Sequence, residues 1–370
     1  MKYFISVLLI IFLCACSFNG NKRRQNSFVS NNIHILKLEN KNIDLLSNFV
    51  DSISFLPLKE EDDFLFATIN KLIIKENYIY LLDVWVTNSL LVFDNSGNFV
   101  RKIGNRGGGP EDYVRLWDFD VDSTGVQIYD RATKQILKYD VHGNFLQKKE
   151  TPFRADGFKL LTSQKYLFSL AKEDNLYQVI LTDSNFQVKS SFFPYTKNYL
   201  DNKMTDNVFQ EVQDTIFYNK LINDSIYSFS KDGELIGGVL FDFGSNIPPI
   251  DIRNDYAKMT GERKRRHFMY FYDTPFRVNN HWVGKMFNGQ NKATFLYNTD
   301  TDEYYIYDLV DMKINYTDIY MPLFSNKKYI VGWLNLDIYN SFNKKPVLDS
   351  AMINLLEEGG HLLCFYYLNY

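Results

Sequence analysis

Short stretches of alternating hydrophobic and polar residues recur from about residue 67 to residue 310, separated by turns rich in Asp, Asn, Ser and Gly. Residues 78–83 (YIYLLD) and 125–130 (GVQIYD) are two examples. Alternation with a period of two places successive side chains on opposite faces of a β-strand. Phe and Tyr, which favour strands, are abundant, with 31 and 26 copies. The pattern predicts an all-β chain of many short strands.

The strands belong to a unit that repeats along the chain. Residues 90–99 (LLVFDNSGNF) form a strand, a tight turn and the start of a second strand. Related segments end at residues 145, 186, 235 and, more weakly, 304, which gives steps of 46, 41, 49 and 69 residues. A period of about 40–45 residues with four short strands is typical of a β-propeller blade. The predicted blades cover 67–104, 116–151, 154–193, 208–243, 270–310 and a sixth from about 317.

The sixth blade is one strand short at its C-terminal end. Residues 328–333 and 361–370 supply its second and third strands, and no fourth follows them. Segment 52–58 (SISFLPL) precedes the first blade, and we expect it to close the ring as the outer strand of the last one. Pro57 fits an outermost strand, where a missing N–H donor is tolerated. The predicted fold is a six-bladed β-propeller over residues 51–370.

Three irregular segments, 104–115, 244–269 and 337–360, interrupt the repeat. In a propeller, connections between strands 2 and 3 and crossings from strand 4 to the next blade lie on one face. All three segments belong to these two classes. Two of them contain predicted helices, near 251–268 and 347–358, so we expect helical insertions on one face. That face is the default place to look for a site, because loops on a rigid scaffold commonly carry function.

The first sixteen residues, MKYFISVLLIIFLCAC, have a positive start, an apolar run and a small-residue end before a cysteine. The run is too short to span a bilayer and has the length of a signal-peptide core. Its end, Leu13-Cys14-Ala15-Cys16, resembles a bacterial lipobox. We therefore expect a signal peptide over 1–15, lipid on Cys16, and a tether with a possible extra strand over 16–50. The expected location is the cell envelope, at the outer membrane, facing the periplasm or the surface.

Composition narrows the possibilities further. Hydrophobic residues make up 45% and charged residues 23%, which excludes a disordered chain. The formal net charge is −3, so no overall basic field supports nucleic-acid binding. Cleavage before Cys16 would remove Cys14 and leave only the lipidated Cys16 and Cys364. No disulfide within the chain is then possible, and we expect Cys364 to be a small buried hydrophobic residue.

No motif identifies a reaction. The five histidines, His34, His142, His267, His281 and His361, lack metal-ligand spacing, and no Gly-x-Ser-x-Gly sequence occurs. The glycine-rich loop after Ile103 leads into a strand rather than a helix, which argues against a phosphate cradle. We predict no catalytic, cofactor-binding or metal-binding residue. The sequence leaves open a divalent metal in the central channel, where Glu111 and Asn223 offer oxygen atoms.

The repeat and one loop carry a resemblance to a known family. The loop is Gly104 to Tyr113, GNRGGGPEDY, and the resemblance covers about residues 50–370. The chain resembles the six-bladed β-propeller lipoproteins of Bacteroidetes, which are related to NHL-repeat and TolB-like propellers. In that family a glycine usually follows the proline of this loop, whereas here Glu111 and Asp112 follow Pro110. The resemblance implies an envelope propeller and does not name a ligand.

Three hypotheses follow. The sequence favours a non-enzymatic binding or scaffolding module for a glycan, a peptide or an envelope protein, anchored to the membrane through Cys16. The second is a metal-assisted hydrolase or lyase with its site in the central channel, and the third is an assembly component of an outer-membrane complex. The candidate ligand-face residues come from the decorated loops and the loops beside them: Arg106, Glu111, Tyr113, Arg131, Arg154, Asn223 and Arg263.

Overall fold

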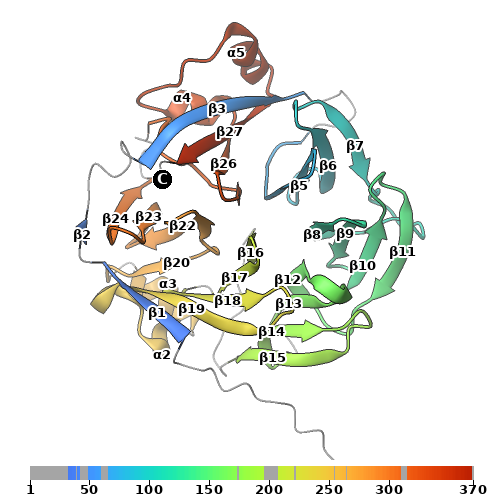
Figure 1. The fold of residues 1–370 in the computed structure, drawn as a ribbon, viewed down its shortest axis with the longest axis horizontal. Coiled ribbons are helices and arrows are strands. Elements are labelled where there is room, and N and C mark those ends of the chain that lie inside the picture. Colours follow the sequence, from blue (N-terminus) through green and yellow to red (C-terminus); the bar gives the residue numbers. More distant parts are fainter. Residues whose placement is uncertain are drawn as a thin grey trace, which may run out of the picture.

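The computed structural model describes residues 32–38, 40–41, 49–59, 66–172, 175–195, 207–220, 222–253, 255–263, 265–309 and 315–368. These residues form six β-sheets arranged as blades around a central axis (Figure 1). The six-bladed propeller that the sequence repeat predicts is therefore the fold of this chain. The predicted signal peptide and Cys16 lie outside the described residues.

In blades 1 to 3, four antiparallel strands run from the axis outward in chain order. Blade 1 contains β4 (Lys71–Lys75), β5 (Tyr78–Asp83), β6 (Ser89–Asp94) and β7 (Phe99–Ile103). Blade 2 contains β8 (Leu116–Asp122), β9 (Gly125–Asp130), β10 (Gln135–Tyr139) and β11 (Phe145–Glu150). Blade 3 contains β12 (Ala155–Leu160), β13 (Tyr166–Leu170), β14 (Tyr177–Thr182) and β15 (Val188–Pro194). Each range falls within about four residues of the one predicted from the repeat.

Blades 4 to 6 also receive strands from the N-terminal segment. Blade 4 contains β16 (Phe209–Val212), β17 (Thr215–Asn219), β18 (Ser225–Ser230), β19 (Leu235–Asp242) and β1 (Ile33–Lys37). Blade 5 contains β20 (Met269–Phe271), β21 (Phe276–Val278), β22 (His281–Asn288), β23 (Asn291–Asn298), β24 (Glu303–Asp308) and β2 (Asn40–Lys41). Blade 6 contains β25 (Phe324–Ser325), β26 (Tyr329–Leu334), β27 (His361–Leu368) and β3 (Val50–Leu58).

The N-terminal strands run along the outside of the last three blades (Figure 1). β1 pairs in parallel with β19, and β2 pairs in parallel with β24. β3 pairs antiparallel with β27 and brings Pro57 opposite Leu362, so the proline sits on the outermost strand of blade 6. The possible extra strand at 33–38 corresponds to β1. Three successive blades thus share one continuous segment of chain at their outer edge.

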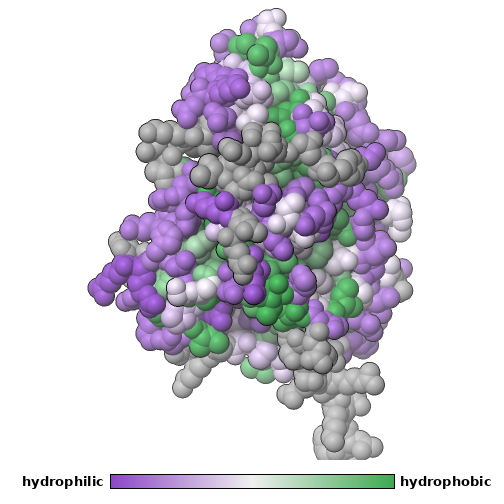
Figure 2. All heavy atoms as spheres, turned by 60° about the vertical axis from the view of Figure 1, so that its left-hand side comes forward, coloured by the Kyte–Doolittle hydropathy of each residue, from purple (hydrophilic) through white to green (hydrophobic). Residues whose placement is uncertain are grey.

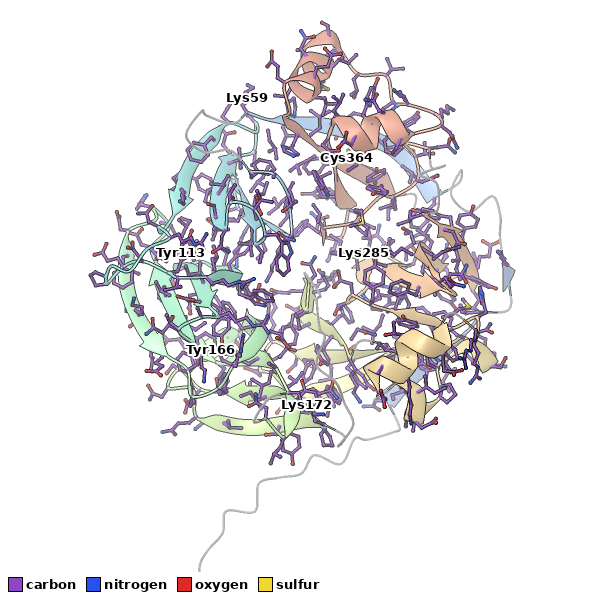
Figure 3. All side chains as sticks on the ribbon, turned by 180° about the vertical axis from the view of Figure 1, so that it is seen from behind. Lys59, Tyr113, Tyr166, Lys172, Lys285 and Cys364 are labelled. Atoms are coloured by element: carbon purple, nitrogen blue, oxygen red, sulfur yellow. The ribbon has the colours of Figure 1, made fainter. Side chains whose placement is uncertain are left out.

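The core lies between the blades. Each pair of neighbouring sheets encloses its own cluster of buried hydrophobic side chains. Cys364 belongs to the cluster between blades 5 and 6 and is only 4% exposed, and this burial raises the pKa of its thiol (Figure 3). The outer side that carries β1, β2 and β24 is mainly hydrophilic, with scattered hydrophobic patches (Figure 2). These inter-blade clusters contain most of the buried hydrophobic side chains of the described residues.

The two faces of the ring differ. We call the face with the 2–3 loops and the inter-blade crossings the upper face, and the face with the 1–2 and 3–4 turns the lower face. The helices α2 (Ile250–Arg253), α3 (Tyr256–Arg263), α4 (Leu336–Ser341) and α5 (Ser350–Glu357) all lie in connections of the upper face. Asp349 caps α5 by accepting a hydrogen bond from the Met352 N–H at 2.8 Å. The predicted helical insertions therefore share one face, and α4 is a helix that the pattern did not reveal.

No helix within the described part of the chain is long and apolar enough to cross a membrane.

Candidate functional site

The glycine-rich loop between blades 1 and 2 is held together by its own backbone. The N–H of Gly107 donates to the carbonyl of Tyr113, and the N–H of Tyr113 donates to the carbonyl of Asn105. Gly104 has a φ of 64°, and a Cβ atom there would lie 2.5 Å from the Tyr139 hydroxyl. A residue other than glycine would therefore be strained and crowded at this position. The loop is a tight crossing between two blades.

Tyr113 supports this crossing from inside. It is fully buried between blades 1 and 2, and its hydroxyl donates to the carbonyl of Asn88 at 2.9 Å (Figure 3). Burial raises the pKa of Tyr113 to about 12. The structure therefore places Tyr113 in the core and not on the ligand face for which the sequence selects it. Arg106 and Glu111 of the same loop are exposed.

Two tryptophans and two arginines stack beside this crossing on the upper face. Trp85 comes from the β5–β6 loop, Arg115 and Trp117 from the start of blade 2, and Arg131 from the β9–β10 loop. The two indole rings meet edge to face at 5.5 Å. The Arg131 guanidinium lies 4.0 Å from the Trp117 ring centroid, and that of Arg115 lies 5.4 Å from the same ring and 5.9 Å from Trp85. We call these four residues the Trp–Arg patch.

The patch is partly open to solvent and partly anchored. Trp85 remains 45% exposed, and Val86, which follows it in the chain, and Val114, which precedes Arg115, are exposed as well. Trp117 donates its indole N–H to the carbonyl of Asp156 at 3.1 Å, and Arg131 forms an ion pair with the Asp156 carboxylate at 3.1 Å. These contacts fix the inner tryptophan, while the outer one presents its ring to solvent. Exposed aromatic rings beside arginines are common at the centres of binding interfaces.

Two buried aspartates at the ends of second strands hold the loops that carry the patch. Asp83 accepts hydrogen bonds from the N–H groups of Trp85 and Val86 at 3.1 and 2.9 Å. Burial alone would raise the pKa of Asp83, but these and neighbouring hydrogen bonds bring it below its ordinary value. Asp130 plays the same part in blade 2 and accepts from the Arg115 N–H at 3.1 Å. The patch is therefore preorganised by the ends of regular strands.

The other predicted residues lie in different places. Arg154 precedes β12, close in the chain to the Asp156 partner of the patch. Asn223 belongs to the β17–β18 loop of blade 4, where it is buried and accepts from Arg253 at 3.1 Å. Arg263 is the last residue of α3, and its side chain lies outside the described residues. The residues predicted from the sequence are thus divided between blades 1 to 3 and the region of blades 4 and 5, and they do not form one site.

Sequence reasoning missed Trp85, Arg115 and Trp117. Their neighbours in the chain gave no motif, because the three residues converge only when blades 1 and 2 pack together.

Sequence reasoning also missed Lys220, whose ammonium lies 4.2 Å from the ring centroid of Phe193 and 4.5 Å from that of Tyr227. Burial, together with the charge of Arg253, lowers the pKa of Lys220 to about 8.

Ion pairs link the inner strands around the central channel. Lys71 of blade 1 contacts Asp118 of blade 2 at 2.7 Å. Lys159 of blade 3 contacts Asp120 of blade 2 at 3.0 Å and Glu211 of blade 4 at 2.7 Å. In blade 5, Lys285 contacts Asp273 at 2.6 Å. Each of these inward carboxylates therefore has a lysine partner.

Metal binding gains no support from the side chains that the structure describes. Among them, no group of three or more His, Cys, Asp or Glu residues could hold a metal ion. Glu111 sits on the exposed crossing between blades 1 and 2, whereas Asn223 contacts a guanidinium in blade 4. The two residues that the sequence offers as metal-binding oxygens thus belong to different blades.

The fold and the Trp–Arg patch together define a six-bladed β-propeller with a preorganised aromatic and basic surface. The chain belongs to the family described as "Domain of unknown function (DUF4934)", whose model matches residues 30–362. Among curated proteins, none matches the chain.

Two solved structures are similar. A "Putative exported protein" from Bacteroides fragilis has 21% identity and a TM-score of 0.75, covering 91% of this chain and 100% of that one. A member of the DUF4221 family from Bacteroides vulgatus has 11% identity and a TM-score of 0.53, covering 86% of this chain and 97% of that one. At these identities the likeness shows the fold.

Proposed function

We propose that this protein is an exported, lipid-anchored binding module of the cell envelope that recognises a polypeptide through the Trp–Arg patch. The patch itself carries the proposal: a half-exposed Trp85 stacked in a row of aromatic and guanidinium groups on the upper face. Tryptophan and arginine dominate the energetics of protein interfaces, because they combine large contact area with directional polar groups.

The arginines indicate the chemistry of the ligand. Arg131 already has a carboxylate partner in Asp156, whereas Arg115 contacts the two indole rings and Arg106 is exposed on the neighbouring loop. Carboxylates are the natural partners of such guanidinium groups, which bind them in a bidentate manner. A segment with acidic residues next to an apolar one fits this surface, as in an exported peptide or another envelope protein.

The expected cellular location of the protein supports the same role. The signal-peptide pattern over residues 1–15 and the Leu-Cys-Ala-Cys sequence ending at Cys16 favour export and lipidation. The similar protein from Bacteroides fragilis carries an exported description, which agrees with this assignment. In cells fed a palmitate analogue that can be detected by click chemistry, we expect the wild type to become labelled and Cys16→Ser to remain unlabelled. Label on Cys16→Ser would contradict the anchor.

The binding proposal is tested by chemical cross-linking in envelope membranes, followed by mass spectrometry. Wild type, Trp85→Ala and Arg115→Ala are compared with Val347→Ala, which changes a 98% exposed residue on the same face. We expect polypeptides cross-linked near the patch to disappear in the first two variants and persist in the third. Circular dichroism confirms that the variants fold. A cross-link pattern unchanged by both patch variants would refute the proposal.

A further inference from the structure

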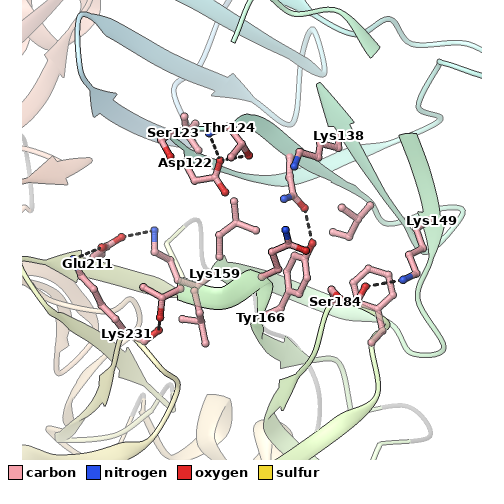
Figure 4. Close-up of a pocket in the computed structure, with 18 of the residues that line it drawn as sticks. Asp122, Ser123, Thr124, Lys138, Lys149, Lys159, Tyr166, Ser184, Glu211 and Lys231 are labelled. Carbon is pink, nitrogen blue, oxygen red and sulfur yellow. Dashed lines mark hydrogen bonds and ion pairs between the residues drawn. The ribbon is translucent and has the colours of Figure 1, made fainter. Parts of the chain in front are cut away.

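A hollow lies on the lower face of the ring, on the opposite side from the Trp–Arg patch. It has a volume of about 610 Å³ and is enclosed by the 1–2 turns of blades 2 and 3, which include Asp122–Thr124, and by the 3–4 turn of blade 3, which includes Ser184–Phe186 (Figure 4). This volume is within the roughly 300–1,000 Å³ that small-ligand sites occupy. It adjoins a second hollow of 380 Å³ along the inner strands, and both are lined by Lys75, Lys159 and Glu211.

Lysines dominate the charge of this hollow. Five of them line it, Lys75, Lys138, Lys149, Lys159 and Lys231, against the two carboxylates Asp122 and Glu211. The formal charge of the lining is therefore +3, whereas the whole chain carries −3. Lys138 and Lys149 stand on one side, and Lys159 and Lys231 stand on the other beside Glu211 (Figure 4). A locally positive hollow on an acidic protein favours an anionic ligand.

Three of the five lysines lack a carboxylate partner among the described residues. Lys159 forms ion pairs with Asp120 and Glu211. Lys231 forms ion pairs with Glu211 and Asp214. Lys75 donates to the carbonyl of Val121 at 2.8 Å, and Lys149 donates to the carbonyl of Ser184 and to the Asn185 side-chain oxygen at 2.6 and 2.7 Å. The side chain of Lys138 has neither a hydrogen bond nor an ion pair within the described part of the chain. These three ammonium groups keep their charge available to a ligand.

The floor of the hollow departs from the sequence repeat. In the 3–4 turns of blades 1, 2 and 4, the left-handed position is glycine: Gly97, Gly143 and Gly233. Blade 3 places Phe186 there, with a φ of 58°, a conformation that is unfavourable for a bulky side chain. The ring packs 5.3 Å from that of Tyr166, and the Lys149 ammonium lies 5.2 Å from its centroid. This backbone conformation places the Phe186 ring in the floor of the hollow, and unfavourable conformations of this kind cluster at ligand sites.

A fixed polar group completes the floor. The Tyr166 hydroxyl donates to the Oε1 atom of Gln127 at 2.9 Å, which holds this buried amide in place. The Nε2 group of Gln127 remains as a donor, and Thr124 and Gln164 add polar groups at the rim. The hollow thus combines cationic groups, amide and hydroxyl groups, and the carboxylates Asp122 and Glu211, which can accept hydrogen bonds from ligand hydroxyls.

We propose that this lower-face hollow binds an acidic oligosaccharide, with its carboxylate or sulfate groups against Lys75, Lys138 and Lys149. Lysine suits this task because it acts as a mobile point charge that adapts to several anions. The amide, hydroxyl and carboxylate groups of the lining match the many hydroxyls of a sugar. The inference stands independently of the Trp–Arg patch, since the two surfaces share no residue and lie on opposite faces.

Isothermal titration calorimetry on the full-length protein tests this proposal. A polyoxyethylene detergent is used, because it keeps a lipid-anchored chain in solution and carries no sugar. The probes are digalacturonic acid, a sulfated chondroitin disaccharide, neutral lactose, and sodium sulfate at matched ionic strength. We expect at least one of the two acidic disaccharides to bind, lactose not to bind, and affinity to fall as salt rises, because mobile ions screen exposed charges.

Three variants locate the site. We expect Lys138→Gln and Lys149→Gln each to weaken binding of the acidic disaccharide by about tenfold, the low end of the loss for one hydrogen bond to a charged group. Lys345→Gln is the matched control: Lys345 also donates to an asparagine oxygen and lies 4.6 Å from the centroid of an aromatic ring, Tyr339, but in blade 6. It should bind as the wild type does.

Several outcomes would overturn the proposal. The absence of heat with both acidic disaccharides, or equal binding of lactose, would exclude an acidic sugar as the ligand. Sulfate that binds as tightly as the disaccharides would reduce the hollow to a simple anion site. An affinity unchanged in both lysine variants, or an equal loss in Lys345→Gln, would place binding elsewhere on the chain.

Discussion

The ion pairs between the inner strands of neighbouring blades allow a direct test of how the blades are held together. Lys159 extends from blade 3 between Asp120 of blade 2 and Glu211 of blade 4, at 3.0 and 2.7 Å. The two carboxylates differ in burial, since the side chain of Asp120 is 1% exposed and that of Glu211 is 36% exposed. Replacing Lys159 with methionine keeps most of the side-chain volume and removes the ammonium group with its charge and its hydrogen bonds.

The magnitude follows from that difference in burial. Removing one partner of a buried ion pair typically costs about 3–5 kcal/mol, because the other charge stays buried without compensation. Asp120 would still accept hydrogen bonds from the N–H groups of Leu160 and Val121, at 2.7 and 3.0 Å. We therefore expect Lys159→Met to lower the free energy of unfolding by about 3 kcal/mol at pH 7, the low end of that range. The half-exposed Glu211 adds little, because solvent screens it.

The pKa of Asp120 determines how the stability deficit of Lys159→Met changes with pH. Burial acts to raise the pKa of Asp120, but Lys159 and Lys71 outweigh it and hold the pKa below its ordinary value. In the wild type, Asp120 therefore stabilises the fold above its unfolded pKa, and this contribution is lost as the pH falls through the lower folded pKa. Without Lys159, burial raises that pKa, and protonation then relieves the buried charge. The deficit of the variant should shrink between pH 7 and pH 4.5.

Urea unfolding followed by tryptophan fluorescence at both pH values measures the deficit. Lys231→Met is the matched control, because Lys231 pairs with the exposed Asp214 and its loss should barely move the midpoint. Combining Lys159→Met with Asp120→Asn should recover most of the stability, since Asp120 no longer leaves an uncompensated buried charge. The reasoning is refuted if Lys159→Met unfolds at the wild-type midpoint at pH 7, or if its deficit is the same at pH 4.5.

Two further predictions concern stability and reactivity. Gly97→Ala should destabilise the fold by well over about 1 kcal/mol, because its φ is 78° and a Cβ atom would lie 2.0 Å from the Pro57 carbonyl oxygen of β3. Gly244→Ala, with a φ of 59° and no atom within 4 Å, has the backbone strain without the clash, so equal urea midpoints would disprove this reasoning. Burial raises the pKa of the Cys364 thiol, so iodoacetamide should modify it only after unfolding, as peptide mass mapping would show.

The blades could be predicted because local chemistry determines their turns. Asp94 accepts hydrogen bonds from Ser96 and Asn98, Asp140 repeats the arrangement with His142 and Asn144, and a left-handed glycine follows each aspartate. Each turn depends only on residues within five positions, so the sequence pattern alone identifies it. The β1 and β2 additions to blades 4 and 5 depend on distant partners, and the sequence showed only an ambiguous strand at 33–38.

The candidate site was less predictable for the same physical reason. The glycine-rich loop was the most distinctive segment, yet Gly104 serves close packing against Tyr139, and Tyr113 is buried. The surface that stands out in the structure joins Trp85 to Trp117 across two blades, and no spacing along the chain encodes that contact. The repeat aligns Phe186 with Phe99, whereas the structure places Phe186 at the turn position that Gly97 occupies in blade 1, so the sequence pattern did not reveal its role.

The place where the chain leaves the ring bears on both proposed surfaces. β1 is the outermost strand of blade 4, so the segment that leads back to Cys16 starts from the rim and not from either face (Figure 1). Sixteen residues lie between Cys16 and Ile33, and a chain of this length spans at most about 60 Å when it is fully extended. A lipid on Cys16 would therefore connect to the ring at its rim, within about 60 Å of the membrane. That attachment leaves the upper patch and the lower hollow open together, so one molecule could hold a polypeptide on one face and an acidic glycan on the other.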